Sequence, residues 1–179
     1  MQVNSFPPVC GSGARVLILG SMPGIRSLQA GQYYAHPRNA FWPIMESLFS
    51  IPASADYSER LAGLKQAGIA LWDTLGQCYR EGSLDASIEA TSERPNDFLW
   101  LFDNHPGIGH IFFNGAKAES SFRKHVLARL EARYPNLVYT RLPSTSPAHA
   151  SLSFDQKRQH WEAVRVALQS SASGSKSSP

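Results

Sequence analysis

Four short apolar runs stand out along the chain, and each is followed by turn-forming or polar residues. The apolar character within each run is continuous rather than alternating, and β-branched or aromatic side chains form part of it. Continuous apolar character over a few residues is typical of strands that are buried on both faces of a parallel sheet. The sequence therefore predicts four such strands, at Val16–Leu19, Ile69–Trp72, His110–Phe113 and Leu137–Thr140.

Apolar residues at helical spacing lie between these runs and after the last of them. Helices are predicted over 41–49, 59–67, 98–102 and 116–130, and a last helix begins near Ser153. Ser153 and Gln156 fit a capping box, and Asn96 fits the cap of the helix at 98–102. The apolar stripe of the last helix consists of Phe154, Trp161, Val164 and Leu168.

Strands that alternate with helices predict an α/β domain. The expected architecture is a three-layer αβα sandwich, in which helices cover both faces of a central, mainly parallel four-stranded sheet. The chain has neither a repeat nor a linker that would divide it, so we expect a single domain over residues 1–169. The segment 170–179 is rich in serine and cannot build a core, so we expect a disordered tail there.

Composition narrows the class of protein. Of the 179 residues 42% are hydrophobic and 17% are charged, which is ordinary for a soluble globular protein. The net charge of +3 is compatible with a polyanionic partner without requiring one. The first residues lack the features of a signal peptide, and no stretch is long enough to span a membrane. The two cysteines, Cys10 and Cys78, fit free thiols, so we expect a cytoplasmic protein of the bacterial type.

Two loops at predicted strand ends carry residues that suit ligand binding. Ligands of open parallel sheets gather at the carboxyl ends of the strands. The loop Gly20–Gly24 follows the first strand, and its two glycines let the backbone approach a ligand closely. It is neither a P-loop nor a dinucleotide fingerprint, because the Lys-Ser/Thr pair and a third glycine are missing. The segment 142–151 follows the fourth strand and places three hydroxyl groups between two prolines. Each loop taken alone also fits an ordinary turn.

These loops and two further segments together resemble the signature motifs of the uracil-DNA glycosylase superfamily. Leu71–Thr74 ends the second strand where that superfamily reads the base, and Asn114–Ala118 ends the third strand and opens a helix. The segment 33–42, Tyr-Tyr-Ala-His-Pro-Arg-Asn-Ala-Phe-Trp, resembles the hypoxanthine-DNA (deoxyinosine) glycosylase branch. The resemblance runs from Phe6 to about Leu168.

The resemblance implies a monofunctional DNA glycosylase of base excision repair. Such an enzyme flips a deaminated base out of DNA, cleaves its bond to the sugar and leaves an abasic site. The branch implies hypoxanthine as the base and damaged DNA as the partner, double-stranded and conceivably also single-stranded. We expect a monomer with no cofactor and no metal, because the six histidines show no paired ligand spacing. The alternatives are a glycosylase that acts on uracil in G·U mismatches and a non-catalytic module that binds nucleotides or DNA.

The chain departs from the superfamily pattern at two positions. Met22 stands where the first loop often carries Asp or Asn to handle water, and Leu142 stands where the second loop often opens with His. Neither side chain can perform that chemistry. The hypoxanthine branch implies that Asn39 takes over the central catalytic role. From the residues alone, Asn39 also fits the N-cap of the helix that follows it.

The predicted site has one catalytic residue, Asn39, and two sets of binding residues. The base-binding set is Gly20, Ser21, Met22, Pro23, Gly24, Tyr34, Phe41, Asp73 and Asn114. The DNA-binding set is Lys117, Ser144, Thr145, Ser146, Pro147 and His149. Other interpretations remain open: Phe41 as a core residue, Asp73 as a cap, and Lys117 as a solvated surface lysine. Arg26, Arg38 and Arg80 are further candidates for contacts with phosphate, or surface arginines.

Overall fold

The computed structural model describes residues 1–173, and its centre is a four-stranded parallel sheet. The strands are β2 (Val16–Gly20), β3 (Ile69–Asp73), β6 (His110–Asn114) and β7 (Val138–Leu142), in the order β3-β2-β6-β7. All neighbours are parallel and the first residues of the four strands pair with one another, so their carboxyl ends form one edge of the sheet. The predicted sheet is confirmed, with the fourth strand ending two residues later than expected.

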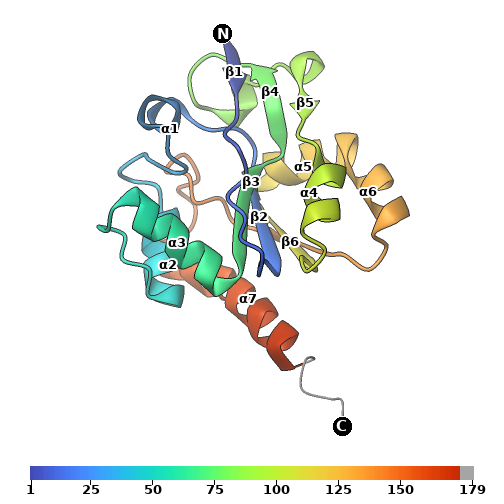
Figure 1. The fold of residues 1–179 in the computed structure, drawn as a ribbon. Coiled ribbons are helices and arrows are strands. Elements are labelled where there is room, and N and C mark those ends of the chain that lie inside the picture. Colours follow the sequence, from blue (N-terminus) through green and yellow to red (C-terminus); the bar gives the residue numbers. More distant parts are fainter. Residues whose placement is uncertain (174–179) are drawn as a thin grey trace.

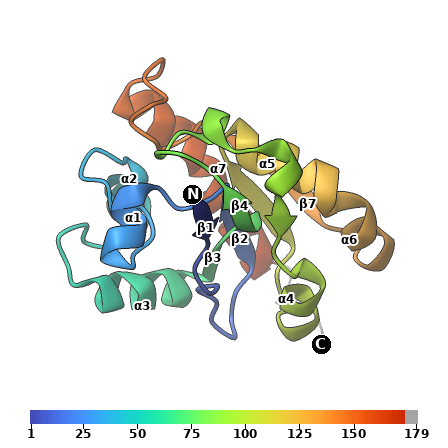
Figure 2. The same cartoon turned by 90° about the horizontal axis from the view of Figure 1, so that it is seen from above.

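Helices cover both faces of this sheet, as predicted (Figures 1 and 2). On one face the strands pack against α2 (Phe41–Phe49), α3 (Tyr57–Ala67) and α7 (Phe154–Ser173). On the other face lie α4 (Phe98–Asn104), α5 (Ala116–His125) and α6 (Leu127–Arg133). Alternate residues of each strand enter the two cores, because successive side chains of a strand point to opposite faces. This explains why the apolar runs are continuous.

Several local predictions about the helices need correction. The expected helix 116–130 is divided at Val126, a β-branched residue whose φ of −123° is not helical. The cap of α4 is Asp97, whose side chain accepts from the Trp100 amide, whereas Asn96 donates to the Asp73 carbonyl. Phe154 is exposed rather than part of the buried stripe of α7.

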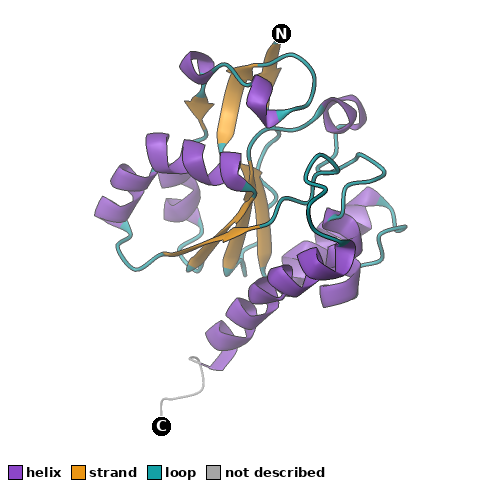
Figure 3. Ribbon diagram, turned by 180° about the vertical axis from the view of Figure 1, so that it is seen from behind, coloured by secondary structure: helices purple, strands orange, loops and turns teal. Residues whose placement is uncertain are grey.

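The last helix begins as predicted and ends later than expected. Ser153 and Gln156 form the capping box, in which each side chain accepts a hydrogen bond from the backbone amide of the other residue. Helix α7 continues through Ser173, which overlaps the segment expected to be a tail (Figure 3). The rest of that segment, 174–179, lies outside the described residues. Within the described part of the chain, no helix combines the length and the apolar character needed to cross a membrane.

A second, smaller sheet stands above the carboxyl edge of the first one and was not predicted (Figure 1). It is antiparallel, in the order β1-β4-β5, with β1 at Gln2–Asn4, β4 at Leu75–Tyr79 and β5 at Arg94–Pro95. Between β4 and β5 the chain forms two turns of 3₁₀ helix, η1 (Asp85–Ser87) and η2 (Ala90–Ser92). A short helix that was also missed, α1 (Ile25–Ala30), follows β2.

Candidate active site

A cavity of about 460 Å³ opens at the carboxyl edge of the parallel sheet. Its walls come from the loop after β2, the loop that precedes α2, the end of β6 with the start of α5, the loop after β7, and the segment between β4 and β5. The volume lies within the range of small-molecule sites. The cavity brings together the predicted residues Gly20, Ser21, Gly24, Tyr34, Asn39, Asn114, Lys117, Ser144, Thr145, Ser146 and His149.

Met22, Pro23, Phe41 and Asp73, predicted to bind the base, and Pro147, predicted to bind DNA, do not line this cavity. Met22 points into the small core beneath the antiparallel sheet, where an apolar side chain is better placed than in a polar site. Pro23 turns its carbonyl towards the buried Arg80 guanidinium. Phe41 is fully buried beneath Tyr34, with the two ring centroids 4.2 Å apart, so it is a core residue.

Asp73 lies directly behind the first loop. A Cβ atom at Gly20 would stand 2.6 Å from Asp73 Oδ1 and 3.2 Å from the Tyr34 hydroxyl, so only glycine permits this approach. Burial, reinforced by the negative charge of Asp85 and opposed by Arg80, raises the pKa of Asp73 to about 8. Asp73 is therefore mostly protonated at neutral pH and can donate a hydrogen bond. It supports the cavity floor and does not contact the cavity itself.

Tyr34 forms part of the cavity wall in a strained conformation. Its φ of 56° lies in the left-handed region, which residues other than glycine and asparagine rarely occupy. Burial and the charge of Asp73 raise the pKa of its phenol. Its hydroxyl is buried and has no hydrogen-bond partner among the described residues. Backbone strain of this kind concentrates at functional sites, and here it fixes an aromatic ring beside the cavity.

Asn39 lies one residue before Ala40, the N-cap of α2. Its Oδ1 accepts a hydrogen bond from the Phe41 amide (3.0 Å) and so helps to cap α2. The next amide, that of Ala40, donates to the Thr145 carbonyl (3.0 Å), which attaches this segment to the loop after β7. The Asn39 Nδ2 has no partner within the described residues, and the side chain lines the cavity. The free end of this amide is therefore a hydrogen-bond donor.

Asn114 and Thr145 join the ends of β6 and β7. Asn114 Nδ2 donates to Thr145 Oγ1 (2.9 Å), and the Thr145 amide donates to Asn114 Oδ1 (2.9 Å). Thr145 is 1% exposed, so its hydroxyl serves this pair rather than a phosphate as predicted. Gly115, with φ of +95°, turns the chain into α5 next to Ser144, where a Cβ would be 3.1 Å from the serine Cβ.

Ser144 and Ser146 line the cavity and are less buried than Thr145. The Ser144 Oγ accepts from the Ser146 amide (3.1 Å), and the Ser146 Oγ accepts from the Ala148 amide (3.2 Å). Both oxygens are thus held by the backbone, while their hydroxyl hydrogens remain able to donate. His149 also lines the cavity, with Nε2 3.4 Å from the Ser151 hydroxyl.

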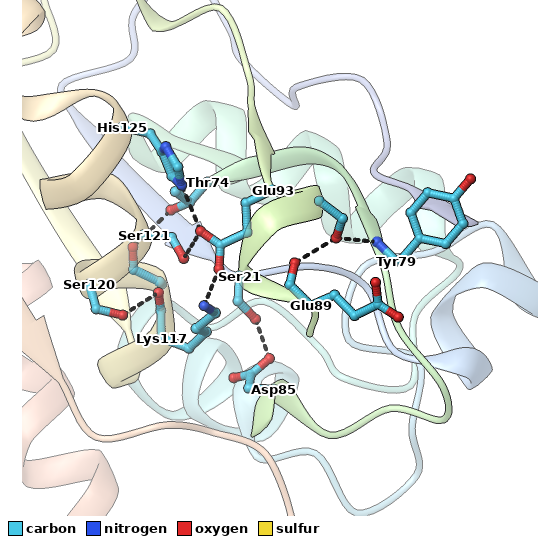
Figure 4. A network of polar contacts seen from close by, with 12 residues as sticks. Ser21, Thr74, Tyr79, Asp85, Glu89, Glu93, Lys117, Ser120, Ser121 and His125 are labelled. Atoms are coloured by element: carbon cyan, nitrogen blue, oxygen red, sulfur yellow. Dashed lines mark hydrogen bonds and ion pairs between the residues drawn. The ribbon is translucent and has the colours of Figure 1, made fainter. Parts of the chain in front are cut away.

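Lys117 lines the cavity but is not a solvated surface lysine. Its ammonium pairs with Glu93, a buried carboxylate just before β5, and His125 Nε2 lies 2.6 Å from the second oxygen of Glu93 (Figure 4). Burial would raise the pKa of Glu93, but the hydrogen bonds from Lys117 and His125 outweigh it and hold that pKa below the usual value. The predicted contact between Lys117 and phosphate would compete with this ion pair.

The antiparallel sheet supplies a cavity residue that the sequence did not reveal. Asp85, at the start of η1, lines the cavity and accepts a hydrogen bond from the Ser21 hydroxyl (2.6 Å; Figure 4). Arg80 is 1% exposed and donates to the Pro23 and Gly82 carbonyls, so its predicted contact with phosphate is wrong. Asp85 and Arg80 lie in a polar segment without hydrophobic periodicity, so the sequence did not indicate where their side chains would lie. Among the described residues, no group of three His, Cys, Asp or Glu side chains is arranged to hold a metal ion.

Comparisons with known proteins identify the family of the chain. The model of the uracil DNA glycosylase superfamily matches residues 7–168. A hypoxanthine DNA glycosylase of Methanosarcina barkeri is 40% identical over 119 residues, which cover 66% of this chain and 74% of that protein. A hypoxanthine DNA glycosylase of Methanosarcina acetivorans is 34% identical over 167 residues, covering 92% of this chain and 98% of that protein.

A solved structure agrees with these sequence comparisons. The solution NMR structure of a candidate uracil DNA glycosylase from Methanosarcina acetivorans superimposes with a TM-score of 0.78 at 34% identity, covering 94% of this chain and 99% of that one. The fold is therefore shared along nearly the full length of both proteins. The chain belongs to the uracil DNA glycosylase superfamily.

Proposed function

We propose that this protein is a monofunctional DNA glycosylase that removes hypoxanthine from DNA and leaves an abasic site. The observation that carries the proposal is the cavity at the carboxyl edge of the parallel sheet, where Tyr34, Asn39 and Asn114 converge with the serine loop after β7. Two relatives named hypoxanthine DNA glycosylase support this choice of base. Membership of the superfamily supports damaged DNA as the substrate.

The target bond is inaccessible inside a duplex, so the base must first leave the stack. Unstacking costs a few kcal/mol, and less at a mismatched lesion. The cavity accepts the extruded base beside the ring of Tyr34, whose strained backbone and packing against Phe41 hold it in place. The rigid wall recovers part of the unstacking cost by stacking.

Bond cleavage places negative charge on the departing base and positive charge on the sugar. Catalysis then depends on donors aimed at the base and on groups that tolerate a cation near the sugar. The Oδ1 of Asn39 is occupied by the Phe41 amide, so the end that remains for substrate is Nδ2. Asn39 therefore donates to the base as it gains charge. Because this donor does not have to gain or lose a proton, an amide side chain is sufficient to stabilise the departing base.

The contacts with the DNA backbone belong to the loop after β7. The Ser144 and Ser146 hydroxyls donate to phosphate oxygens on either side of the lesion, and the exposed Arg38 adds positive charge next to Asn39. A shallow groove lined by Arg38, Asn39 and Lys157 continues from this side of the cavity. We propose double-stranded DNA as the principal substrate, a monomer as the active form and the cytoplasm as its location.

The test is incubation of the protein with duplexes that contain a single hypoxanthine, uracil or xanthine, followed by alkaline cleavage of abasic sites. Strand scission at hypoxanthine is expected, with a matched undamaged duplex as the control. Scission at uracil alone would replace hypoxanthine with the alternative base. An absence of scission on every lesion, together with retained DNA binding, would support a non-catalytic module instead.

A further inference from the structure

The segment between β4 and β5 is fastened against the loop Gly20–Gly24. The buried Arg80 donates to the Pro23 carbonyl, and the Ile25 amide donates to Ser83 Oγ (2.9 Å). The third tie is the hydrogen bond from Ser21 Oγ to Asp85 Oδ1 (2.6 Å). These ties place η1 at the mouth of the cavity in a defined position, although much of the segment is exposed to solvent.

Asp85 is the one acidic side chain among the described residues that line the cavity. Its Oδ1 is occupied by Ser21, while its Oδ2 has no hydrogen bond within the part of the chain that the structure describes. A carboxylate held by one oxygen presents the other oxygen in a fixed direction. The half-buried His149 also lines the cavity, but its Nε2 already has a partner, the Ser151 hydroxyl at 3.4 Å.

The other residues that might handle water are committed elsewhere. Met22 points into the small core, and the amide of Asn39 presents a donor that cannot accept a proton. Asp73 lies behind Gly20, outside the cavity. We propose that the Asp85 carboxylate orients the attacking water, takes its proton and stabilises the cationic sugar. This inference rests on the proposed glycosylase activity and assigns a catalytic residue to it.

The reaction balances with water as the sole co-reactant. The bond between C1′ and N9 breaks, and its electron pair leaves with the base. The water oxygen then forms a bond to C1′, and the proton that it loses passes to Asp85 Oδ2. That proton returns through solvent to the departing base, which leaves as neutral hypoxanthine, and Asp85 is again a carboxylate.

The surroundings of Asp85 permit this role. Burial raises the pKa of its carboxyl group, whereas the Ser21 hydrogen bond and the positive charges of Arg80 and Lys117 lower it. The cavity also places Tyr34 and His149 near it, and Asp73 lies behind the same loop. A carboxylate with a somewhat raised pKa is a stronger base than one fully in water.

The test is single-turnover excision of hypoxanthine by Asp85→Asn, which keeps an oxygen to accept from Ser21 but cannot take a proton. We expect the rate to fall about 100-fold or more while duplex binding and melting temperature stay near those of the wild type. Asp85→Ser, which shortens the side chain, should lower the rate to a similar extent, and it replaces Asp85→Asn in the test if that variant folds poorly. The matched control is Glu89→Gln in the same segment, where only backbone atoms of Glu89 form hydrogen bonds.

The pH profile separates a base from a merely structural carboxylate. The wild-type rate should fall as acid protonates Asp85, and this acid limb should disappear in Asp85→Asn. A folded Asp85→Asn protein with a rate within a few-fold of Glu89→Gln and an unchanged acid limb would overturn the proposal, while the glycosylase function would stand. A wild-type protein that releases no base from any lesion would instead overturn the proposed function.

Discussion

The two sheets of this protein meet at one cavity, yet they are encoded in different ways. Every residue of β2 and β3 in the parallel sheet is buried, because helices cover both faces. In the antiparallel sheet, β4 buries only Leu75 and Cys78, and both residues of β5 are exposed. The parallel sheet can be recognised in the sequence from its apolar runs. The antiparallel sheet depends on pairing between segments that are distant in the sequence.

The difference extends to the chemistry that each sheet contributes. The parallel sheet brings uncharged groups to the cavity, namely the backbone of Gly20 at the end of β2, the Asn114 side chain at the end of β6, and Thr145 in the loop after β7. The antiparallel sheet and its connection bring charged groups to the same region, namely the buried Arg80 and Glu93 and the Asp85 carboxylate that lines the cavity. We infer that the parallel sheet shapes the site and that the antiparallel sheet supplies its electrostatics. Variants in the two regions can test this division.

The largest effect is expected at Asn39, on the side of the parallel sheet. Asn39→Ala should lower single-turnover excision of hypoxanthine about 100-fold or more, because the donor aimed at the base is lost. Asn39→Asp should be equally impaired, although its carboxylate still accepts from the Phe41 amide. If Asn39→Asp keeps the wild-type rate and only Asn39→Ala is slow, the role of Asn39 is to cap α2 and not to act on the base.

The next effect concerns Glu93 and the stability of the antiparallel sheet. Glu93→Gln leaves Lys117 and His125 without their carboxylate and should lower the free energy of unfolding by about 2 kcal/mol at pH 7. The pKa of Glu93 is lowered by folding, so the ion pairs stabilise the protein above pH about 4.5 and are lost as the pH falls through the lowered value.

Urea unfolding of wild type and variant at pH 7 and pH 3 measures this contribution. The difference between the two proteins should be smaller at pH 3 than at pH 7. Glu119→Gln on α5, the helix that carries Lys117 and His125, is the control. Among the described residues Glu119 pairs with the exposed Arg123 and Arg141, so its loss should change stability by less than about 0.5 kcal/mol. If Glu93→Gln were as stable as this control, the ion pairs of Glu93 with Lys117 and His125 would not stabilise the fold.

A smaller effect is expected at Arg80, which fastens the two regions together. Arg80→Met should lower the excision rate about tenfold, because the segment that bears Asp85 loses its tie to the Pro23 carbonyl. Stability should change little, since an apolar chain replaces a buried charge whose Nη1 has no partner among the described residues. Hydrogen exchange should quicken in residues 82–88 and remain slow in the parallel sheet. Arg129→Met, at an exposed position of α6 away from the cavity, is the matched control, and equal rates for both variants would contradict the prediction.

The smallest effect is expected at Asp73, where the two sheets join. Its pKa rises from 3.8 to about 8 on folding, so the wild-type protein loses stability as the pH rises between these values. Asp73→Asn removes this dependence, so its melting temperature should exceed that of the wild type by more at pH 9 than at pH 5. Asp155→Asn, on the exposed start of α7, should show no such change with pH. If the melting temperatures of Asp73→Asn and the wild type differed by the same amount at pH 5 and pH 9, the carboxyl group of Asp73 would be charged in the folded protein.

The sequence was sufficient for the parallel sheet and for most of the cavity wall. Buried strands need continuous apolar residues, and parallel topology then gathers the loops that follow them, which is why Ser21, Asn114 and Ser144 were found. The resemblance of the segment 33–42 added Tyr34 and Asn39 to this group. Orientation within a loop was less accessible, since Met22 and Ser21 are neighbours that face opposite sides.

The antiparallel sheet escaped prediction for physical reasons. Strand β1 has three residues, and β5 has two, one of which is a proline. Strand β4 contains Gly76, which is placed against the Asn96 side chain and weakens any strand pattern. Asp85 and Glu93 then acquire their environments from contacts with Ser21 and with α5, which no local pattern encodes.

The pair formed by Asn114 and Thr145 has a consequence for how the protein finds its substrate. Two reciprocal hydrogen bonds fix the separation of the loops after β6 and β7 to the spacing of adjacent strands. A mouth of fixed width does not close around a base that is still paired. We therefore expect the site to capture bases that have already opened, so that the lifetime of the open state in the duplex acts as the first filter in recognition. We expect lesions in weak pairs to be found sooner than the same lesions in strong ones.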